Sequence, residues 1–143
     1  MKPQKHSAAL VIYNLERTQF LLVKRPMDDD RFPGYWGFPA ATKKTEDEPW
    51  EATVARAAKE KLGVEVEILK LLGEETKDRG EYELTLRDYE VKIIEGQPTV
   101  PQDVLGMTQY TELKWTDDTS EIEKSAAEGS ACSNIFLTSQ KHE

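Results

Sequence analysis

One amphipathic segment constrains the fold most, because it predicts a single long helix in a chain otherwise rich in strand-forming residues. Between residues 49 and 62 the apolar side chains recur at every fourth position, which is the period of one helix face. These side chains are Trp50, Val54, Ala58 and Leu62. Pro49 suits the first helical position, Glu48 before it is a candidate cap, and Gly63 is a typical helix stop. We therefore expect a helix over 49–62 with this face against the core.

Strand-like segments lie on both sides of this helix. Residues 6–14 and 19–26 predict two strands joined in a hairpin, because a polar turn separates two apolar runs. Further elements follow the long helix: strands at 64–72, 81–96 and 111–116, a short helix at 119–129 and a last helical turn. The chain has no internal repeat, so we expect one domain over 1–143, of class α+β, with flexible ends at about 1–5 and 138–143.

The acidic composition limits the partners that the chain can bind. Its formal charge of −8 argues against a nucleic acid polymer, which requires clustered Lys and Arg. An anionic small molecule would need a local positive site or bound cations. Cys132 is the single cysteine, so an intrachain disulfide and a CxxC zinc motif are excluded. The apolar run near the N-terminus is too short to cross a membrane, and a cytoplasmic location is expected.

A loop rich in Gly, Pro and aromatic residues separates the second expected strand from the helix. Loops of this length, here 27–49, usually carry function. Trp36 and Phe38 could stack on a base or wall a pocket, although their size and apolarity favour the alternative that they anchor the loop in the core. Arg25, at the end of the preceding strand, could bind phosphate or could be an exposed solubilising charge.

Residues 42–64 resemble a degenerate form of the signature of the Nudix hydrolase family, G-x5-E-x7-R-E-U-x-E-E-x-G-U, where U is aliphatic. Aligning Gly63 with the last glycine places Glu48 on the first glutamate and Arg56 on the arginine. Glu60 then falls on the first of the paired acids. The runs LLVKRP, WGFP and TELKWT also resemble the family, so the likeness covers most of the chain. It implies a Nudix fold, with a mixed β-sheet sandwiched between helices.

Three positions depart from that signature. Thr42 stands where the motif has its first glycine, and Ala57 and Lys61 stand where it has two further glutamates. In the family the helix carboxylates hold magnesium or manganese, so the resemblance implies a metal site that lacks two of its ligands. Lys61 disfavours a cation but could bind phosphate as a point charge.

The resemblance also assigns roles to the residues that match. Glu60 is the expected surviving metal ligand, with Glu48 assisting it, and both are the expected catalytic residues. Arg56 with Glu48 is expected to brace the loop against the helix. Acids that could replace the missing metal ligands are Glu46, Asp47 and Asp103. For the first two of these, the alternative is that they stabilise the N-terminus of the helix through its dipole.

Two functions follow from the resemblance. The leading hypothesis is a phosphoanhydride hydrolase acting on a nucleoside diphosphate linked to another group, with a weakened magnesium or manganese site. The alternative is a catalytically silent domain that binds a nucleotide or a protein. Both take a small nucleotide-type molecule, or a partner, rather than a membrane or a nucleic acid. The oligomeric state stays open, and a homodimer is one alternative.

Overall fold

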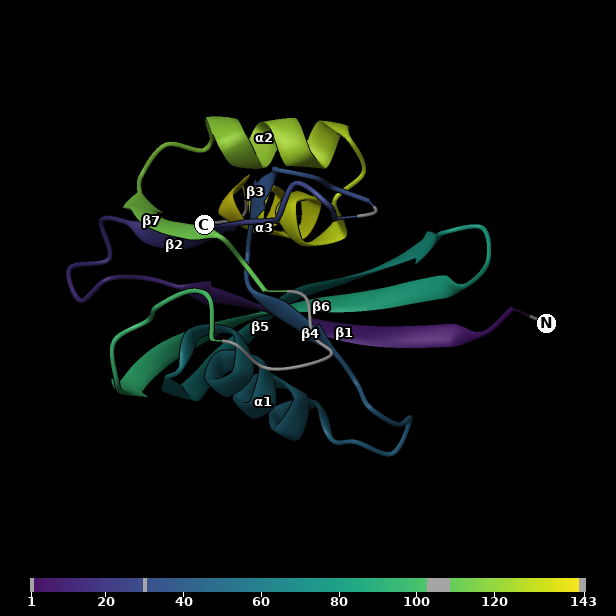
Figure 1. The fold of residues 1–143 in the computed structure, drawn as a ribbon, viewed down its shortest axis with the longest axis horizontal. Coiled ribbons are helices and arrows are strands. Elements are labelled where there is room, and N and C mark those ends of the chain that lie inside the picture. Colours follow the sequence, from purple (N-terminus) through teal and green to yellow (C-terminus); the bar gives the residue numbers. More distant parts are fainter. Residues whose placement is uncertain (1, 30, 103–108, 142–143) are drawn as a thin grey trace.

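Two β-sheets and three helices make up the fold in the computed structural model, which describes residues 2–29, 31–102 and 109–141 (Figure 1). The strands of the larger sheet are β1 (Gln4–Ile12), β4 (Ala40–Thr42), β5 (Glu65–Asp78) and β6 (Glu83–Glu95). Those of the smaller sheet are β2 (Phe20–Lys24), β3 (Trp36–Gly37) and β7 (Glu112–Thr116). The helices are α1 (Trp50–Leu62), α2 (Ser120–Ala127) and α3 (Ala131–Lys141).

The larger sheet has the strand order β4-β1-β6-β5, and the smaller one has the order β3-β2-β7. Because β1 is parallel to β6 but antiparallel to β4, the larger sheet is mixed. Helix α1 lies on one side of it, and α2, α3 and the smaller sheet lie on the other (Figure 1). The expected α+β arrangement, a mixed sheet between helices, is confirmed.

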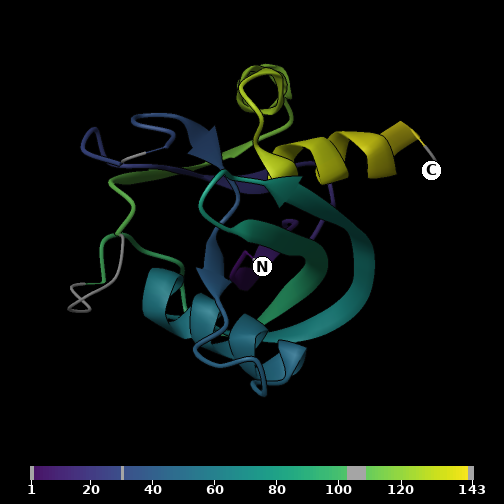
Figure 2. The same ribbon diagram turned by 90° about the vertical axis from the view of Figure 1, so that its right-hand side faces the viewer.

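The long β5–β6 ribbon is bent and links the two helical layers. Its antiparallel pairing carries register shifts at three places along β5, between residues 65 and 73. Such bulges bend a strand and increase its twist. Figure 2 shows the ribbon curving from α1 to α3. The turn at its far end, at residues 79–82, therefore projects beyond both helical layers (Figure 1).

The expected hairpin between residues 6–14 and 19–26 is wrong. A single bridge between Tyr13 and Phe20 closes the turn, after which the two strands enter different sheets. The reason is that both edges of β1 are taken, one by β4 and the other by β6. Strand β2 instead pairs with β3 and β7, which come from distant parts of the chain.

Helix α1 follows its predicted boundaries closely. Val54, Ala58 and Leu62 are buried in the core, as their spacing predicts. Gly63 ends the helix in the left-handed conformation, with φ 74°, and its N–H and that of the next residue bond to carbonyls of the last turn. The predicted cap is different, because Pro49 occupies the N-cap position and the carboxylate of Glu48 bonds elsewhere.

The C-terminal helix is longer than the single turn expected from the sequence. Helix α3 spans eleven residues, and its Phe136 packs against Phe20 and Phe38, with ring centroids 5.0 and 4.9 Å apart. The aromatic partners lie about a hundred residues away in sequence, so local periodicity carries little sign of this helix. Within the described residues, the helices are too short or too polar to cross a bilayer.

Candidate functional site

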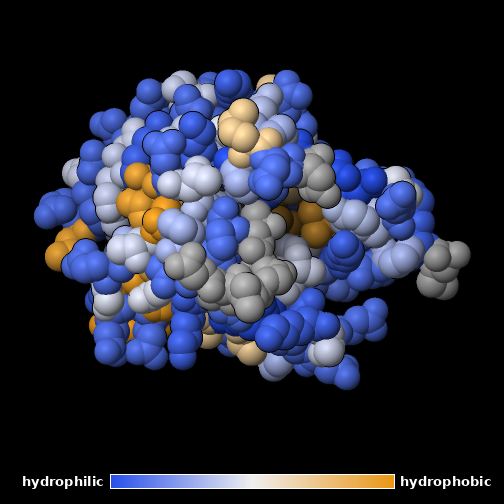
Figure 3. All heavy atoms as spheres, in the orientation of Figure 1, coloured by the Kyte–Doolittle hydropathy of each residue, from blue (hydrophilic) through white to orange (hydrophobic). Residues whose placement is uncertain are grey.

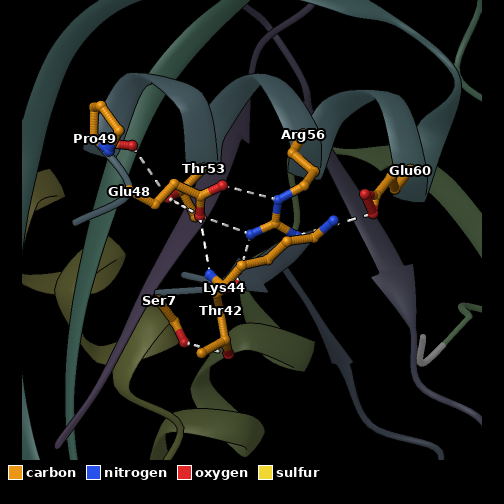
Figure 4. A network of polar contacts seen from close by, with 8 residues as sticks. All are labelled: Ser7, Thr42, Lys44, Glu48, Pro49, Thr53, Arg56 and Glu60. Atoms are coloured by element: carbon orange, nitrogen blue, oxygen red, sulfur yellow. Dashed lines mark hydrogen bonds and ion pairs between the residues drawn. The ribbon is translucent and has the colours of Figure 1, made fainter. Parts of the chain in front are cut away.

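An ion pair joins the loop before α1 to the helix itself (Figure 4). The carboxylate of Glu48 accepts hydrogen bonds from Nε and Nη2 of Arg56, at 3.2 and 2.9 Å. It also accepts from the hydroxyl of Thr53 at 2.8 Å and from the backbone N–H of Lys44 at 3.1 Å. Arg56 in turn donates to the carbonyl of Thr42 at 2.7 Å. The loop is thereby tied to the helix at both of its ends.

These contacts set the charge state of Glu48. The hydrogen bond from Arg56, with those from Thr53 and the backbone of Lys44, outweighs burial and lowers the pKa of Glu48 to about 2. Its oxygens are committed to donors within the protein, and its negative charge is neutralised by the neighbouring guanidinium. Glu48 is therefore arranged as a brace, and we call the Glu48–Arg56 pair the brace below.

The other acids of the motif region do not gather around a common point. The Oε2 of Glu60 lies 3.9 Å from Nη1 of Arg56, which is an ion pair but too long for a hydrogen bond. This oxygen is buried and has no hydrogen-bond partner among the described residues. Glu46 and Asp47 are exposed in the loop, and Asp103 lies outside the described residues. Across residues 2–29, 31–102 and 109–141, no three acidic, His or Cys side chains converge as metal ligands. Within these described ranges, the donor set does not fit a family-type magnesium or manganese centre.

The two replaced positions of α1 face inward. From helix geometry, Ala57 and Lys61 would line a stripe beside the core stripe, yet Ala57 is fully buried in the core and Lys61 is only 4% exposed. The Nζ of Lys61 lies 5.4 Å from the ring centroid of Tyr110. Burial and the nearby Arg25 lower the pKa of Lys61 to about 8, against the opposing charge of Glu60. Lys61 is thus mainly protonated at neutral pH.

Lys61 reaches a cavity of about 810 Å³ between the larger sheet and the loop that follows β2. Figure 3 shows the molecular surface hollowed on this face, with apolar side chains at the bottom of the hollow. Its apolar and aromatic lining includes Phe32, Ala40, Tyr82, Leu84, Leu86 and Tyr110. A cavity of this size, lined by charged, polar and aromatic groups, falls within the volume range of small-molecule sites.

The charged lining of this cavity is strongly positive. Its basic residues are Lys5, Arg25, Arg31, Lys61 and Arg79. Among the described residues, Glu81 is the one acidic side chain in the lining. The guanidinium of Arg25 also forms an ion pair with Asp29, which is not among the lining residues, with Nη1 and Oδ1 3.2 Å apart. A chain with a net charge of −8 therefore concentrates positive charge in one cavity, which supplies the local positive site that an anionic ligand requires.

Two residues singled out from the sequence line this cavity. Arg25 and Lys61, both candidate phosphate-binding residues, lie together in the lining. Lys5, Arg31 and Arg79 were missed, because they come from β1, a loop and the β5–β6 turn, and no sequence spacing connects them.

The aromatic candidates of the loop lie outside the cavity lining. Phe38 is 2% exposed and packs against Phe20 and Phe136, the position that the core-anchoring alternative describes. Trp36 is half-buried, with the Nζ of Lys114 4.3 Å from its ring centroid. Phe32, from the same loop, lines the cavity instead.

Comparisons with known proteins agree on one family. The NUDIX domain profile matches residues 4–121. The fold is similar to that of a MutT protein from Methanosarcina mazei Go1, with 19% identity, a TM-score of 0.74, and coverage of 99% of this chain and 96% of that one.

Two further structures with this fold carry more specific names. An ADP-ribose pyrophosphatase from Streptococcus suis 89-1591 is 18% identical, with a TM-score of 0.58 over 80% of this chain and 75% of that one. A UDP-X diphosphatase is 16% identical, with a TM-score of 0.67 over 100% of this chain and 66% of that one. No curated protein matches the chain.

Proposed function

The chain belongs to the Nudix family, and from that premise we propose that it binds a nucleoside diphosphate linked to another group in the cationic cavity, without needing a divalent cation. The observation that carries this proposal is the position of Lys61. It stands where the motif has a metal-binding glutamate, and it lines the cavity beside Arg25. The ammonium group can bind a phosphate directly. In the motif, a carboxylate at this position would instead bind the phosphate through a cation.

Electrostatics favour an anionic occupant of this cavity. Two like charges about 4 Å apart repel by roughly 4 kcal/mol at an effective dielectric constant of about 20. The charge of Arg25 is, after burial, part of the reason for the lowered pKa of Lys61. A diphosphate between them would replace this repulsion with two charge-assisted attractions. The nucleotide-linked names of the ADP-ribose pyrophosphatase and the UDP-X diphosphatase suggest this ligand class.

Slow hydrolysis of the same ligand is the second candidate function. The observation that favours it is the buried Oε2 of Glu60, which has no hydrogen-bond partner among the described residues. A carboxylate oxygen in that condition could accept a proton from an attacking water. Because the donor set does not fit a family-type metal centre, we expect any turnover to be weak. Loss of one principal electrostatic stabiliser commonly costs about 10²–10³-fold in turnover.

Calorimetric titration with ADP-ribose and a UDP-sugar, in chelator and then in magnesium, tests the binding proposal. We expect dissociation constants on the order of 10 μM that change less than about twofold when magnesium replaces the chelator. Binding that is absent in chelator and tight in magnesium would contradict the proposal. Product release, measured in parallel, distinguishes slow hydrolysis from binding alone. Turnover that is lost in Glu60→Gln but kept in Glu65→Gln, an exposed control on β5, would establish hydrolysis.

A further inference from the structure

The cations of the cavity fall into two groups. Arg25 and Lys61, here called the inner pair, lie near Tyr110. Lys5, Arg31 and Arg79 gather near the β5–β6 turn and are called the turn cations. Burial and the neighbouring Arg25 lower the pKa of Lys61, whereas burial and the neighbouring Arg31 lower the pKa of Arg79. Each group therefore contains like charges that oppose one another locally.

Arg79 contacts neutral groups directly, and the carboxylate of Glu75 is near enough to favour its charged form. Its Nη2 donates to the carbonyl of Gly129 at 3.1 Å, and its guanidinium lies 6.0 Å from the ring centroid of Phe32. Its Nε is buried and has no hydrogen-bond partner among the described residues. A buried donor of this kind is costly unless it is satisfied, and a charged one more so. The nearby Lys5 is likewise placed over an aromatic ring, that of Tyr82, at 4.2 Å.

Aromatic and apolar side chains line the cavity together with the two groups. The guanidinium groups of Arg25 and Arg79 lie 5.6 and 6.0 Å from the centroid of the same Phe32 ring, so this ring approaches one cation of each group. Leu84 and Leu86 of β6 also line the cavity. The space of about 810 Å³ is ample for a molecule larger than one diphosphate. Its lining thus offers cations of both groups, apolar surface and, among the described residues, one acid, Glu81.

We propose that the ligand carries two separate anionic groups, a diphosphate bound by the inner pair and a phosphate monoester bound by the turn cations. This inference rests on the proposed function, because it assumes that the diphosphate occupies the inner pair. It narrows the ligand class to nucleoside diphosphate derivatives that bear an additional phosphate on an organic segment. The apolar side chains of the lining, Phe32, Leu84 and Leu86, then contact that segment.

Two matched dinucleotides test the inference: nicotinamide adenine dinucleotide and its 2′-phosphate, titrated calorimetrically in chelator. We expect the additional phosphate to tighten binding by about tenfold, the gain typical of one charge-assisted hydrogen bond. In Arg79→Gln this advantage is expected to fall below about twofold, with little change for the dinucleotide that lacks the phosphate. Lys92→Gln removes the same charge from an exposed position of β6 outside the cavity and should keep the advantage.

The outcomes separate this inference from the proposed function. If both dinucleotides bind with equal affinity, the second anionic site is overturned and the proposed function stands. If neither dinucleotide binds, the proposed function fails. A titration with inorganic phosphate, followed by NMR, then tests the phosphate site at the turn cations. Saturable chemical-shift changes at the amides of Gly80 and Tyr82, lost in Arg79→Gln, would support a phosphate site there. No change at those amides would overturn it. Circular dichroism of each variant confirms that it is folded.

Discussion

Lys61→Glu is expected to weaken the metal-free binding of ADP-ribose by at least about 100-fold. The substitution replaces a buried ammonium in the cavity lining with a carboxylate, so the local charge changes by two units. The phosphate then meets repulsion from position 61 and from Glu60 beside it. Calorimetric titration in chelator measures the effect. Lys61→Met, which removes the charge without inverting it, should give an intermediate loss.

A matched control is available on the same helix. Lys59 lies on the exposed face of α1, and it is outside the cavity lining. Lys59→Glu makes the same change in net charge and should alter affinity by less than about threefold, because exposed charges are screened by salt. Equal losses of affinity in the two variants would show that only the net charge of the protein matters. Direct binding of phosphate by Lys61 would then be ruled out. Affinity for magnesium, measured in both variants, shows whether Glu at position 61 recovers a cation site.

Arg56→Met is expected to lower the free energy of unfolding by about 2–3 kcal/mol, and the melting temperature by roughly 5–10 °C. The side chains of Arg56 and Glu48 are only 14% and 15% exposed, so removing the guanidinium leaves a largely buried carboxylate without its cation. The hydrogen bond to the carbonyl of Thr42 is lost as well. Chemical denaturation at neutral pH measures the change. As a control, Lys24→Met breaks the more exposed pair with Glu112 and should cost less than about 1 kcal/mol.

The stability difference between the wild type and Arg56→Met should depend on pH in a defined direction. The folded-state pKa of Glu48, about 2, lies below its ordinary value of 4.5. A carboxyl group shifted downwards stabilises the fold fully above the unfolded pKa, and this stabilisation is lost as the pH falls through the folded pKa. The difference should therefore be constant near neutrality and shrink between about pH 4.5 and 2. A difference that persists unchanged at pH 2 would show that lost packing, rather than the ion pair, causes the destabilisation.

Local patterns predicted the parts of the molecule that local physics controls. The four-residue interval between Val54, Ala58 and Leu62 predicted the buried face of α1, and Gly63 predicted its end. The partner of β2 could not be found in this way. Adjacent segments with a polar turn resemble a hairpin, and the competing pairings of β1 with β4 and β6 become visible only in three dimensions.

The cavity escaped prediction for a similar reason. Its positive character depends on Lys5, Arg31 and Arg79 meeting at one end of the larger sheet, although they are far apart in sequence. The inward direction of Ala57 and Lys61 was equally hidden. Helical periodicity places these residues beside the apolar stripe. Whether they are buried depends on how much of α1 is covered by the neighbouring β4 and β5.

The brace has a consequence for how chains of this kind diverge. Glu48 and Arg56 fasten a loop to a helix, and this work is needed whether or not anything is cleaved. The side chains at positions 57 and 61 face inward on another side of the same helix, where selection can act on them separately. The residues that match the family signature at positions 48 and 56 thus fasten the loop, whereas the departures at 57 and 61 lie on the buried side of the helix. A chain can stay recognisable while its chemistry changes.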